Sequence, residues 1–568
     1  MATSITVIQG ASGSGTQDAN LLADGVIDSG DPDLGGNTLS TGALAAIGPS
    51  TNVSVNATNF IKFTDLGGTL TLQTAAGHVV FFNTAFGATG QDITFANVSN
   101  TLATSGAQII ITAGTNLSVG NVNSAGALIA LQAGFSTPGN LTAQGIMGSD
   151  LNLLAAGTTG TITQTGTALV QAVTASASGT ITIDAVSGTT INLNSALGSV
   201  VSLGGNVIQA STQLNVTAAT GITLNTSVAS LKASNSTSGN ISITQAAVPA
   251  TPLATTGTGV VNNAVGGTIT LTNLGSDLTV TPGSPVTSAN GAITLAATDL
   301  HVGPVNSGLA VTTLANSTAG GQFDLGTDAV GKIGLTSGEI NNVTAGTLRI
   351  GSATAGNINV SATINPSGTN ILSLINGSAN IIEAAPLTVA NLRVSSGGIV
   401  FLGFANNVGT LAGSTTGSSF EFANGTNPLT IGTVDSITGL STTNSLVHLH
   451  ANNLDVQQAI NAGTGTVILE PFNTTGDIDL GGSDAAGTLG LTDTELGRVT
   501  AGVLHIGSLS IIGGITISNA ITRHAGYNTL TLQTDGSIGQ TAPLSVANLA
   551  VQSSGADVVL TNALNNAD

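Results

Sequence analysis

The chain of 568 residues contains no cysteine and no tryptophan, and its only tyrosine is Tyr527. The absence of cysteine excludes disulfide bonds and metal sites built on thiolates. The scarcity of aromatic rings removes the platforms on which many proteins stack sugar rings or bases. Carbohydrate binding by stacking is therefore not expected.

Charged residues are also scarce, at 6% of the chain, and positive charge is the scarcer sign. Twenty-seven carboxylates stand against seven lysines and arginines, which gives a formal net charge of −20. The basic residues are scattered singly, so no patch exists to neutralise phosphates, and we expect no nucleic acid partner. The sparse negative charge keeps a large surface soluble.

Long apolar runs are missing as well. No run of 18 apolar residues occurs, so the sequence predicts no membrane span. Residues 1–10, MATSITVIQG, lack the basic and apolar regions of a signal peptide. The last copy of an internal repeat stops at the end of the chain, so we interpret the chain as a piece of a longer array.

What the chain has in abundance is glycine, 77 residues, together with a 41% apolar fraction. A turn residue followed by alternating apolar and polar residues recurs, for example at 179–183 (GTITI), 239–243 (GNISI) and 267–271 (GTITL). Alternation over so few residues predicts short half-buried strands. Hairpins of such strands would expose many edges, whereas a coil pairs each strand with the turns above and below.

The sequence therefore predicts an all-β fold, a β-solenoid with an aliphatic interior. With roughly 20 to 25 residues per rung, the chain would form about 25 rungs. At about 4.8 Å between strands, the stack would be an elongated rod on the order of 120 Å long.

A large internal repeat supports this interpretation. Residues 331–352 and 487–508 are identical at 13 of 22 positions, at an offset of 156 residues. Similar flanking blocks extend the match, so that 321–413 resembles 476–568. Repetition on this scale is typical of solenoids, whose units stack on their neighbours.

The predicted domain organisation has two parts. Residues 1–45 are the least regular and are expected to be an irregular N-terminal cap or the edge of a fragment. Residues 46–568 are expected to be one continuous β-solenoid. Residues 246–267 contain Pro249 and Pro252, and they are expected to form a loop or side insertion.

Several blocks within residues 321–568 resemble the repeat region of filamentous-haemagglutinin-type bacterial adhesins: TDTELGRVTAGVLHIGS, GSIGQTAPLSVANLAV, FANNVGTLAG and NPLTIGTVDSITGLSTT. The resemblance implies a right-handed parallel β-helix in a protein secreted to the bacterial cell surface. Export would follow a two-partner-secretion route, through an outer-membrane transporter, or an autotransporter-like route. The Asn-Pro-Asn motifs of that family's secretion domain are absent, and Asn365-Pro366 and Asn427-Pro428 are isolated pairs.

We therefore expect a structural or adhesive segment of an extracellular surface protein, a rigid rod for display and attachment. Its expected partners are glycans or proteins on host or neighbouring cells, and we expect no enzyme activity and no cofactor. Two alternatives are a β-helical polysaccharide lyase or hydrolase and a self-assembling sheath or surface-layer protein.

The strongest candidate for a metal site is the pair His448 and His450. Residues i and i+2 of a strand face the same way, so both imidazoles lie on one side. A metal site needs a third ligand and groups that orient the histidines. A neighbouring rung could supply that ligand, but the sequence names none, so we interpret the pair as outward-facing polar residues and predict no metal site.

The strongest candidate for a catalytic pair is Asp477 with Asp479, on either side of inward-facing Ile478. Parallel β-helix enzymes that act on polysaccharides use acidic clusters, and glycoside chemistry needs one carboxyl group with a raised pKa. Such sites usually add a basic residue, and the nearest in sequence is Arg498. We predict that this pair is not catalytic.

Two further sets of carboxylates have structural interpretations. The N-terminal aspartates are expected to belong to a solvated cap, with a Ca²⁺ site as the alternative; they are Asp18, Asp24, Asp28, Asp31 and Asp33. Glu339 and Glu495 occupy equivalent places in the two repeat copies, as do Asp324 and Asp479. Recurrence in both copies indicates a turn or capping role rather than a single site.

Overall fold

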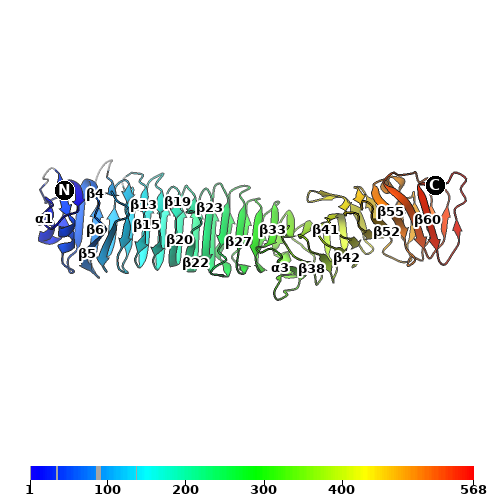
Figure 1. The fold of residues 1–568 in the computed structure, drawn as a ribbon, viewed down its shortest axis with the longest axis horizontal. Helices are drawn as coiled ribbons and strands as arrows, with labels where there is room; N and C mark the ends of the chain where they lie inside the picture. The colour runs from blue at the N-terminus through cyan, green and yellow to red at the C-terminus, as the bar shows by residue number, and fades with distance from the viewer. Residues whose placement is uncertain (1, 33–35, 85–90, 136, 568) are drawn as a thin grey trace. The chain divides into compact units, whose positions relative to one another are not determined.

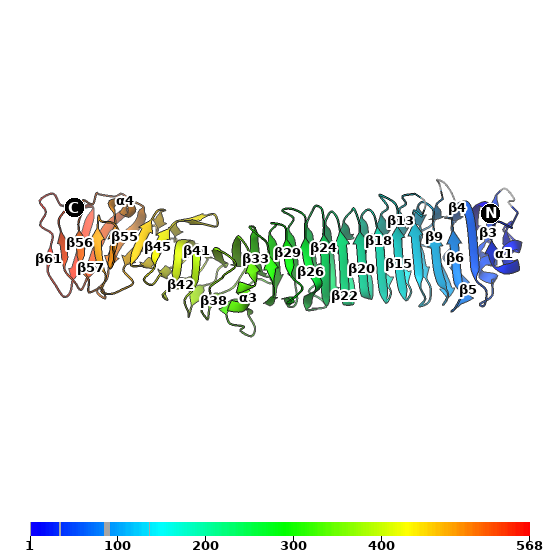
Figure 2. The same ribbon diagram turned by 180° about the vertical axis from the view of Figure 1, so that it is seen from behind.

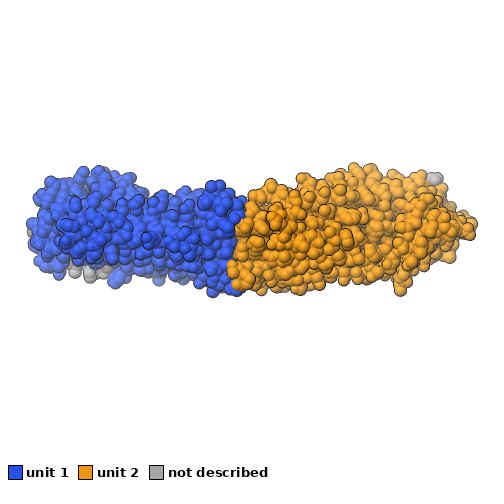
Figure 3. Space-filling model, turned by 90° about the horizontal axis from the view of Figure 1, so that it is seen from below, with its two compact units in different colours: residues 1–276, 283–291 blue, residues 277–282, 292–568 orange. Residues whose placement is uncertain are grey.

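The computed structural model describes residues 2–32, 36–84, 91–135 and 137–567. The chain divides into two compact units (Figure 3). Unit 1 comprises Met1–Ser276 and Gly283–Gly291, and unit 2 comprises Asp277–Pro282 and Ala292–Asp568. The prediction that residues 46–568 form one continuous solenoid stays a prediction. Each unit is a parallel β-helix, as predicted: short strands pair in parallel with those of the preceding and following rung (Figures 1 and 2).

Strands from nine successive rungs of unit 1 form a continuous parallel ladder. Its members are β7 (Ile93–Phe95), β10 (Leu117–Ser118), β13 (Leu141–Ala143), β16 (Ile162–Gln164), β19 (Ile181–Ile183), β21 (Val200–Ser202), β23 (Ile222–Val228), β25 (Ile241–Gln245) and β27 (Ile269–Asn273). Their first residues pair in register, from Ile93 to Ile269. All nine are Ile, Leu or Val with at most 1% of their surface exposed. This row of the interior is therefore aliphatic, as expected, although Phe63 and Phe82 are also fully buried in unit 1.

Rung length varies along this ladder. The rung that leads from Ile162 to its partner Ile181 is much shorter than the one that leads from Ile241 to Ile269. Part of the extra length lies within a paired strand of the longer rung, where Leu231 pairs with Thr255 but Ala233 pairs with Val260. The rung length expected from the sequence falls between these two cases.

Unit 2 has an equivalent ladder that carries its candidate site. The strands are β34 (Phe323–Gly326), β38 (Ile358–Val360), β40 (Ile381–Glu383), β42 (Val400–Leu402), β44 (Phe420–Ala423), β49 (Val447–His450), β52 (Thr466–Glu470), β55 (Val499–Gly507) and β57 (Tyr527–Thr534). Their inward residues run in register from Phe323 to Leu530 and are buried. The next residue on each strand faces outward, and this outward column includes Glu421, His448 and His505.

The repeated motif is a local insertion into one rung of the β-helix. In the first copy, β35 (Ile333–Thr336) pairs with β34, the strand directly before it in the chain, Phe323 with Ile333, and α3 (Ser337–Asn341) follows. In the second copy, β54 (Thr488–Leu491) pairs in the same way with β53 (Asp477–Leu480), and α4 (Asp493–Leu496) follows. The sequence repeat is thus a repeat of a strand and a short helix added to one rung.

The glutamates of this motif cap the two helices. Thr336 Oγ1 accepts from the backbone N–H of Glu339, and Glu339 Oε2 accepts from the backbone N–H of Thr336, at 3.3 and 3.0 Å. Thr492 and Glu495 form the same capping box. The remaining oxygen of each glutamate accepts from a backbone N–H of an earlier rung, Glu339 Oε1 from Val302 and Glu495 Oε1 from Val456, both at 3.0 Å. The predicted capping role of both glutamates is confirmed.

The prediction of an irregular segment over residues 1–45 is wrong at its start. Strand β1 (Ala2–Ile8) pairs in parallel with β3 (Asn37–Ser40) and β4 (Val53–Phe63). Ile5 and Val7 are fully buried and alternate with Ser4 and Thr6, the same signal that marks the later strands. The helices α1 (Asp18–Asp24) and α2 (Thr41–Ala46) complete this end of unit 1.

The prediction of a loop over residues 246–267 is wrong in its middle, whereas residues 246–252 and 263–267 lie outside any strand. Strand β26 (Leu253–Asn262) occupies its middle and pairs with β24 (Ser230–Asn235), with a register shift between two paired segments. Leu253, Thr255 and Val260 are buried. The prolines lie in the turn before this strand, where a missing N–H costs no ladder hydrogen bond.

Buried amide side chains satisfy the backbone at the corners of the coil. Asn235 Nδ2 donates to Asn262 Oδ1 at 2.9 Å, and Asn235 Oδ1 accepts from the Gly221 N–H at 2.8 Å. In unit 2, Asn406 Oδ1 accepts from the Leu387 N–H at 2.7 Å. Buried turns would otherwise leave polar backbone groups without partners, which is costly.

One corner of unit 2 contains a buried carboxyl group. Glu383 Oε1 accepts from the backbone N–H of Phe404 at 2.6 Å and from Asn406 Nδ2 at 3.0 Å. Burial raises the pKa of Glu383 to about 7, although these two hydrogen bonds act to lower it. The second repeat copy has Gln540 at this place, paired with Asn565 through two hydrogen bonds of 2.8 Å. An amide therefore fits the same corner.

None of the helices in the described ranges is long and apolar enough to cross a membrane.

The substitution Glu383→Gln should stabilise the protein at alkaline pH. Because the pKa is raised from 4.5 to about 7 on folding, the folded state keeps a proton that the unfolded state has lost. Stability therefore falls as pH rises through this window, and the substitution should recover up to about 3 kcal/mol at pH 8 and little at pH 4.5. Urea unfolding at both pH values measures this difference.

The reverse change at the equivalent place, Gln540→Glu, is the matched control and should destabilise the protein at pH 8. A Glu383→Gln variant that is less stable than the parent at pH 8 would contradict the assignment of a buried, reluctantly ionised carboxyl group.

Candidate functional site

The candidate site is a group of four side chains on the outer face of unit 2, here called the His–Glu cluster: Glu421, His448, His450 and Glu470. The two histidines lie on β49 at alternate positions, so they face the same way, as expected. Glu421 comes from β44 in the preceding rung and pairs in register with His448. Glu470 ends β52 in the following rung and pairs with His450. Three successive rungs thus bring these residues together.

A single carboxylate oxygen joins the two imidazoles. Glu470 Oε1 lies 2.8 Å from His448 Nε2 and 3.1 Å from His450 Nδ1. The other nitrogen of His450, Nε2, lies 3.9 Å from Glu421 Oε1. The two ring centroids are 3.8 Å apart. The cluster is therefore compact, and both rings are held by the same neighbour.

Glu470 is ionised in this setting although only 6% of its surface is exposed. Burial acts to raise its pKa, but the contacts of Oε1 with His448 and His450 hold the pKa well below its ordinary value. Its second oxygen, Oε2, is buried and has no hydrogen-bond partner among the described residues. One buried carboxylate oxygen therefore remains available.

His505 lies on the same outward column, one rung after Ile468. Burial lowers its pKa, while a hydrogen bond with Gln533 and the charge of Glu470 act in the opposite direction. Its Nε2 is buried without a hydrogen-bond partner in the described part of the chain. A third imidazole thus borders the cluster.

Glu421, His448 and His450 are a candidate set of ligands for a metal ion. Their potential ligand atoms lie within 4.8 Å of one another, and no other group of three or more His, Cys, Asp or Glu residues does so across the described ranges. The sequence predicts the shared face of the two histidines but not the third residue. The alternation Phe420-Glu421-Phe422 could have indicated an outward carboxylate, but variable rung length hid its register with His448.

A second polar group on unit 2 serves a structural purpose. Asp435 lies at the tip of the antiparallel hairpin of β46 (Thr433–Val434) and β47 (Ile437–Thr438). Three side chains in register on β37 (Thr347–Gly351), β39 (Ile371–Ile375) and β41 (Thr388–Ser396) surround its carboxylate: Arg349, Ser373 and Arg393. The hairpin therefore folds back over three rungs, and we call this contact the Asp435 clasp.

The clasp uses two of the few basic residues of the chain. Arg349 donates from Nη2 to Asp435 Oδ1 at 2.6 Å and from Nε to Oδ2 at 2.8 Å. Ser373 Oγ donates to Oδ2 at 2.6 Å, and Arg393 Nη1 lies 3.3 Å from the same oxygen. Burial acts to raise the pKa of Asp435, but these partners hold it below its ordinary value. A bidentate arginine with two further donors is a specific, charge-assisted contact.

The structure does not bring Arg498, the nearest basic residue in sequence, to the aspartate pair on β53. Asp477 Oδ1 accepts from the Gly514 N–H at 2.8 Å, and Asp479 Oδ1 is buried without a hydrogen-bond partner among the described residues. Arg498 instead donates to the Val456 carbonyl. Asp324, the equivalent of Asp479 in the first copy, lies 3.7 Å from Lys332.

Arg498 borders a polar hollow of about 400 Å³ beside α4, with Asp455, Asp484 and Glu495. Burial, together with the charges of Glu495 and Asp455, raises the pKa of Asp484, although the Gly490 N–H donates to it. Both oxygens of Glu495 are already engaged in the capping box and with Val456. The hollow is thus mainly a by-product of the capped helix.

The described N-terminal aspartates accept hydrogen bonds from backbone groups of turns. Asp18 is 1% exposed and accepts from the backbone N–H groups of Gly13, Gly15 and Ser40 and from the Ser40 hydroxyl. Burial acts to raise its pKa, but these hydrogen bonds hold it below its ordinary value. Asp24, Asp28 and Asp31 each accept from a nearby backbone N–H in the same turn. Asp33 lies outside the described residues.

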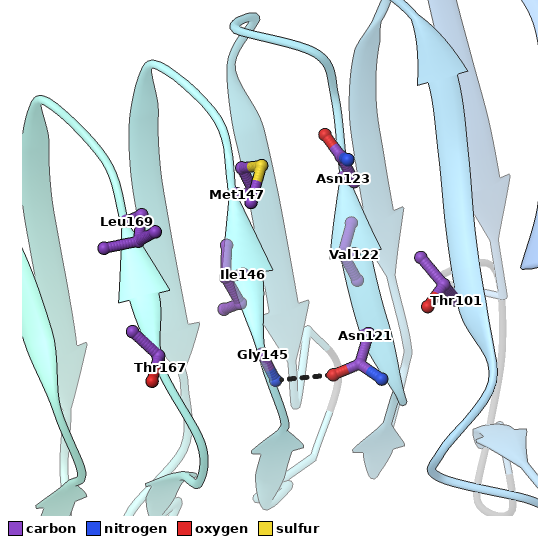
Figure 4. Close-up of a pocket in the computed structure, with 9 residues that line it drawn as sticks. All are labelled: Thr101, Asn121, Val122, Asn123, Gly145, Ile146, Met147, Thr167 and Leu169. Carbon is purple, nitrogen blue, oxygen red and sulfur yellow. Dashed lines mark hydrogen bonds between the residues drawn. The ribbon is translucent and has the colours of Figure 1, made fainter.

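Unit 1 has a shallow apolar hollow of about 310 Å³ that the sequence did not indicate (Figure 4). It lies along β8 (Thr101–Ser105), β11 (Asn121–Asn123), β14 (Ile146–Met147) and β17 (Ala168–Leu169). Met147 and Leu169 are about half exposed there, and Asn121 Oδ1 accepts from the Gly145 N–H at 3.0 Å. Its lining contains no titratable side chain, so it offers no acid–base chemistry.

No protein-family model, curated protein or solved structure matches the chain. The likeness to filamentous-haemagglutinin-type repeats thus depends on the sequence blocks alone.

Removing the charge of Asp435 should destabilise unit 2. Asp435→Asn leaves Arg349 and Arg393 without their carboxylate, and we expect a loss of about 2 kcal/mol, less than for a fully buried pair because Arg349 is one-third exposed. The pKa of Asp435 is lowered on folding, so its contribution is complete above the unfolded value of 3.8 and is lost as pH falls through the folded value. Urea unfolding at pH 7 measures the loss.

Asp455→Asn is the control, because Asp455 is exposed and contacts Gln457 rather than an arginine. It should change the free energy of unfolding by less than about 0.5 kcal/mol. Equal effects of the two substitutions would show that the clasp does not hold the hairpin.

Proposed function

We propose that this chain is a structural and adhesive segment of a large secreted bacterial surface protein. It would act as a stiff spacer that presents attachment surfaces outside the cell. The observation that carries this proposal is the parallel ladder within each unit, lined by buried apolar residues from Ile93 to Ile269 in unit 1 and from Phe323 to Leu530 in unit 2.

Such ladders give length and stiffness together. Rungs are about 4.8 Å apart, so a unit of roughly 280 residues with about 22 residues per rung extends roughly 60 Å along its axis. Bending the stack would stretch many hydrogen bonds at once, and the close-packed interior resists compression. No disulfide contributes, because the chain has no cysteine.

The surface suits contacts with other macromolecules better than chemistry on small molecules. Outward positions on the strands are mostly Thr, Ser and Asn, and turns present single apolar side chains such as Val248 and Leu309, which are 86% and 88% exposed. Glycans or proteins on host or neighbouring cells are the partners that we propose. An outer-membrane transporter is the proposed partner during export, which a chain without cysteine can undergo unfolded.

Polysaccharide cleavage is the alternative that one assay separates from this proposal. A screen for new reducing ends on acidic polysaccharides should show no product for the parent chain. Product formation that disappears in Asp477→Asn and Asp479→Asn would replace the structural role by an enzymatic one.

Adhesion predicts saturable binding of the folded chain to surfaces. The purified chain, labelled at amines, should bind to cultured epithelial cells, mucin or extracellular-matrix proteins, and unlabelled chain should compete. The heat-unfolded chain and a globular protein of similar negative charge serve as controls. Binding that neither saturates nor competes would contradict the adhesive role and would leave the spacer role alone.

A further inference from the structure

We propose that the His–Glu cluster of unit 2 binds a zinc-class divalent metal ion. His448, His450 and Glu421 are the ligands, and Glu470 positions the two imidazoles.

The donor set selects the class of metal. Two imidazole nitrogens and one carboxylate oxygen suit Zn²⁺ and its borderline neighbours, whereas Ca²⁺ and Mg²⁺ require mainly oxygen ligands in larger number. Three protein ligands with a fourth position open to solvent is a common arrangement for zinc. The side chains of His448, His450 and Glu421 are 18%, 24% and 28% exposed, so an ion can reach them.

The distances are close to those that a bound ion needs. Ligand atoms about 2.0–2.1 Å from a tetrahedral zinc ion lie about 3.4 Å from one another. In the structure the three candidate ligands lie within 4.8 Å of one another, and His450 Nε2 is 3.9 Å from Glu421 Oε1. Small rotations of side chains on rigid strands bring them to the required spacing.

Glu470 holds both rings in a suitable orientation. It contacts Nε2 of His448 and Nδ1 of His450, which leaves Nδ1 of His448 and Nε2 of His450 for the metal. Metal-bound histidines commonly donate their other N–H to a carboxylate, which fixes the tautomer and makes the ligand more basic. A buried carboxylate shared by two histidines is the arrangement expected for this role.

Unpartnered polar atoms next to the cluster are an independent indication of a missing group. Glu470 Oε2 and His505 Nε2 are both buried without hydrogen-bond partners among the described residues. Buried polar atoms nearly always have partners, and an ion with its bound water would supply them. Because Glu421 lies on the rung before the two histidines, the ion would also link those two rungs.

The test uses the full chain and Zn²⁺ alone. Titration at pH 7.5 against a chromophoric chelator should show one ion per chain, and Co²⁺ should give the visible absorption bands of a tetrahedral site with nitrogen and oxygen ligands. The absence of cysteine removes thiolate binding as a background. His448→Gln and His450→Gln should each weaken binding by at least about 100-fold, and Glu421→Gln by about 10- to 100-fold.

Glu470→Gln tests whether Glu470 orients the two imidazoles or only supports the fold. If it orients them, the substitution should alter the Co²⁺ spectrum and weaken metal binding by about 10- to 100-fold while the metal-free fold is retained. His524→Gln is the matched control: His524 also contacts a carboxylate, with Nε2 2.7 Å from Asp493 Oδ1, but it lies outside the cluster. It should bind Zn²⁺ as the parent does.

Circular dichroism and urea unfolding in the presence of a chelator verify that each variant is folded. Should a histidine variant fail to fold, Glu421→Gln still tests the site, because the Glu421 carboxylate is partly exposed and lies on the outward face of β44. The proposal is overturned if the parent chain binds no Zn²⁺ at micromolar concentrations, or if binding is unchanged in His448→Gln, His450→Gln and Glu421→Gln.

Discussion

The structure depends on the parallel pairing of each strand with the strands one rung before and after it. So short a strand cannot bury its apolar face alone, but the stack buries Ile162 against Leu141 and Ile181 and repeats that contact at every rung. The pairing also satisfies the backbone N–H and C=O groups of the strands with hydrogen bonds, so only the ends of a stack present unpaired edges. Buried amide side chains such as those of Asn235 and Asn406 supply the hydrogen bonds that are needed in the turns.

The same pairing decides where polar chemistry can occur. Residues separated by one rung of the coil become neighbours on one face, so a site is a column across rungs rather than a segment of sequence. The His–Glu cluster joins Glu421, His448 and Glu470 in this way, and the Asp435 clasp joins Arg349, Ser373 and Arg393. The Asp435 clasp uses two of the seven lysines and arginines of the chain, and the His–Glu cluster uses two of its six histidines.

Much of the fold follows from the alternation of apolar and polar residues, and the capping role of Glu339 and Glu495 follows from their recurrence in both copies. The sequence could not give the column neighbours of His448, because rungs as unequal as Ile162 to Ile181 and Ile241 to Ile269 prevent register from being counted along the chain. Strand β26 was missed because two nearby prolines indicate a loop, although Leu253 and Val260 are buried. The sequence shows β35 and α3 as part of a repeat. It does not show that they are inserted into one rung, because the pairing of β35 with β34 is a tertiary contact.

The most direct test of the stacked ladder is a set of distances between spin labels along one outward column of unit 1. The cysteine-free chain allows Ser118→Cys to be paired in turn with Thr223→Cys, Ser242→Cys and Thr270→Cys, which lie five, six and seven rungs away by register. Pulsed electron paramagnetic resonance should give narrow distributions near roughly 24, 29 and 34 Å, rising by about 4.8 Å per rung although the last step spans more of the sequence than the one before it. Distances that follow residue number instead, or broad distributions without a regular step, would contradict the parallel stack.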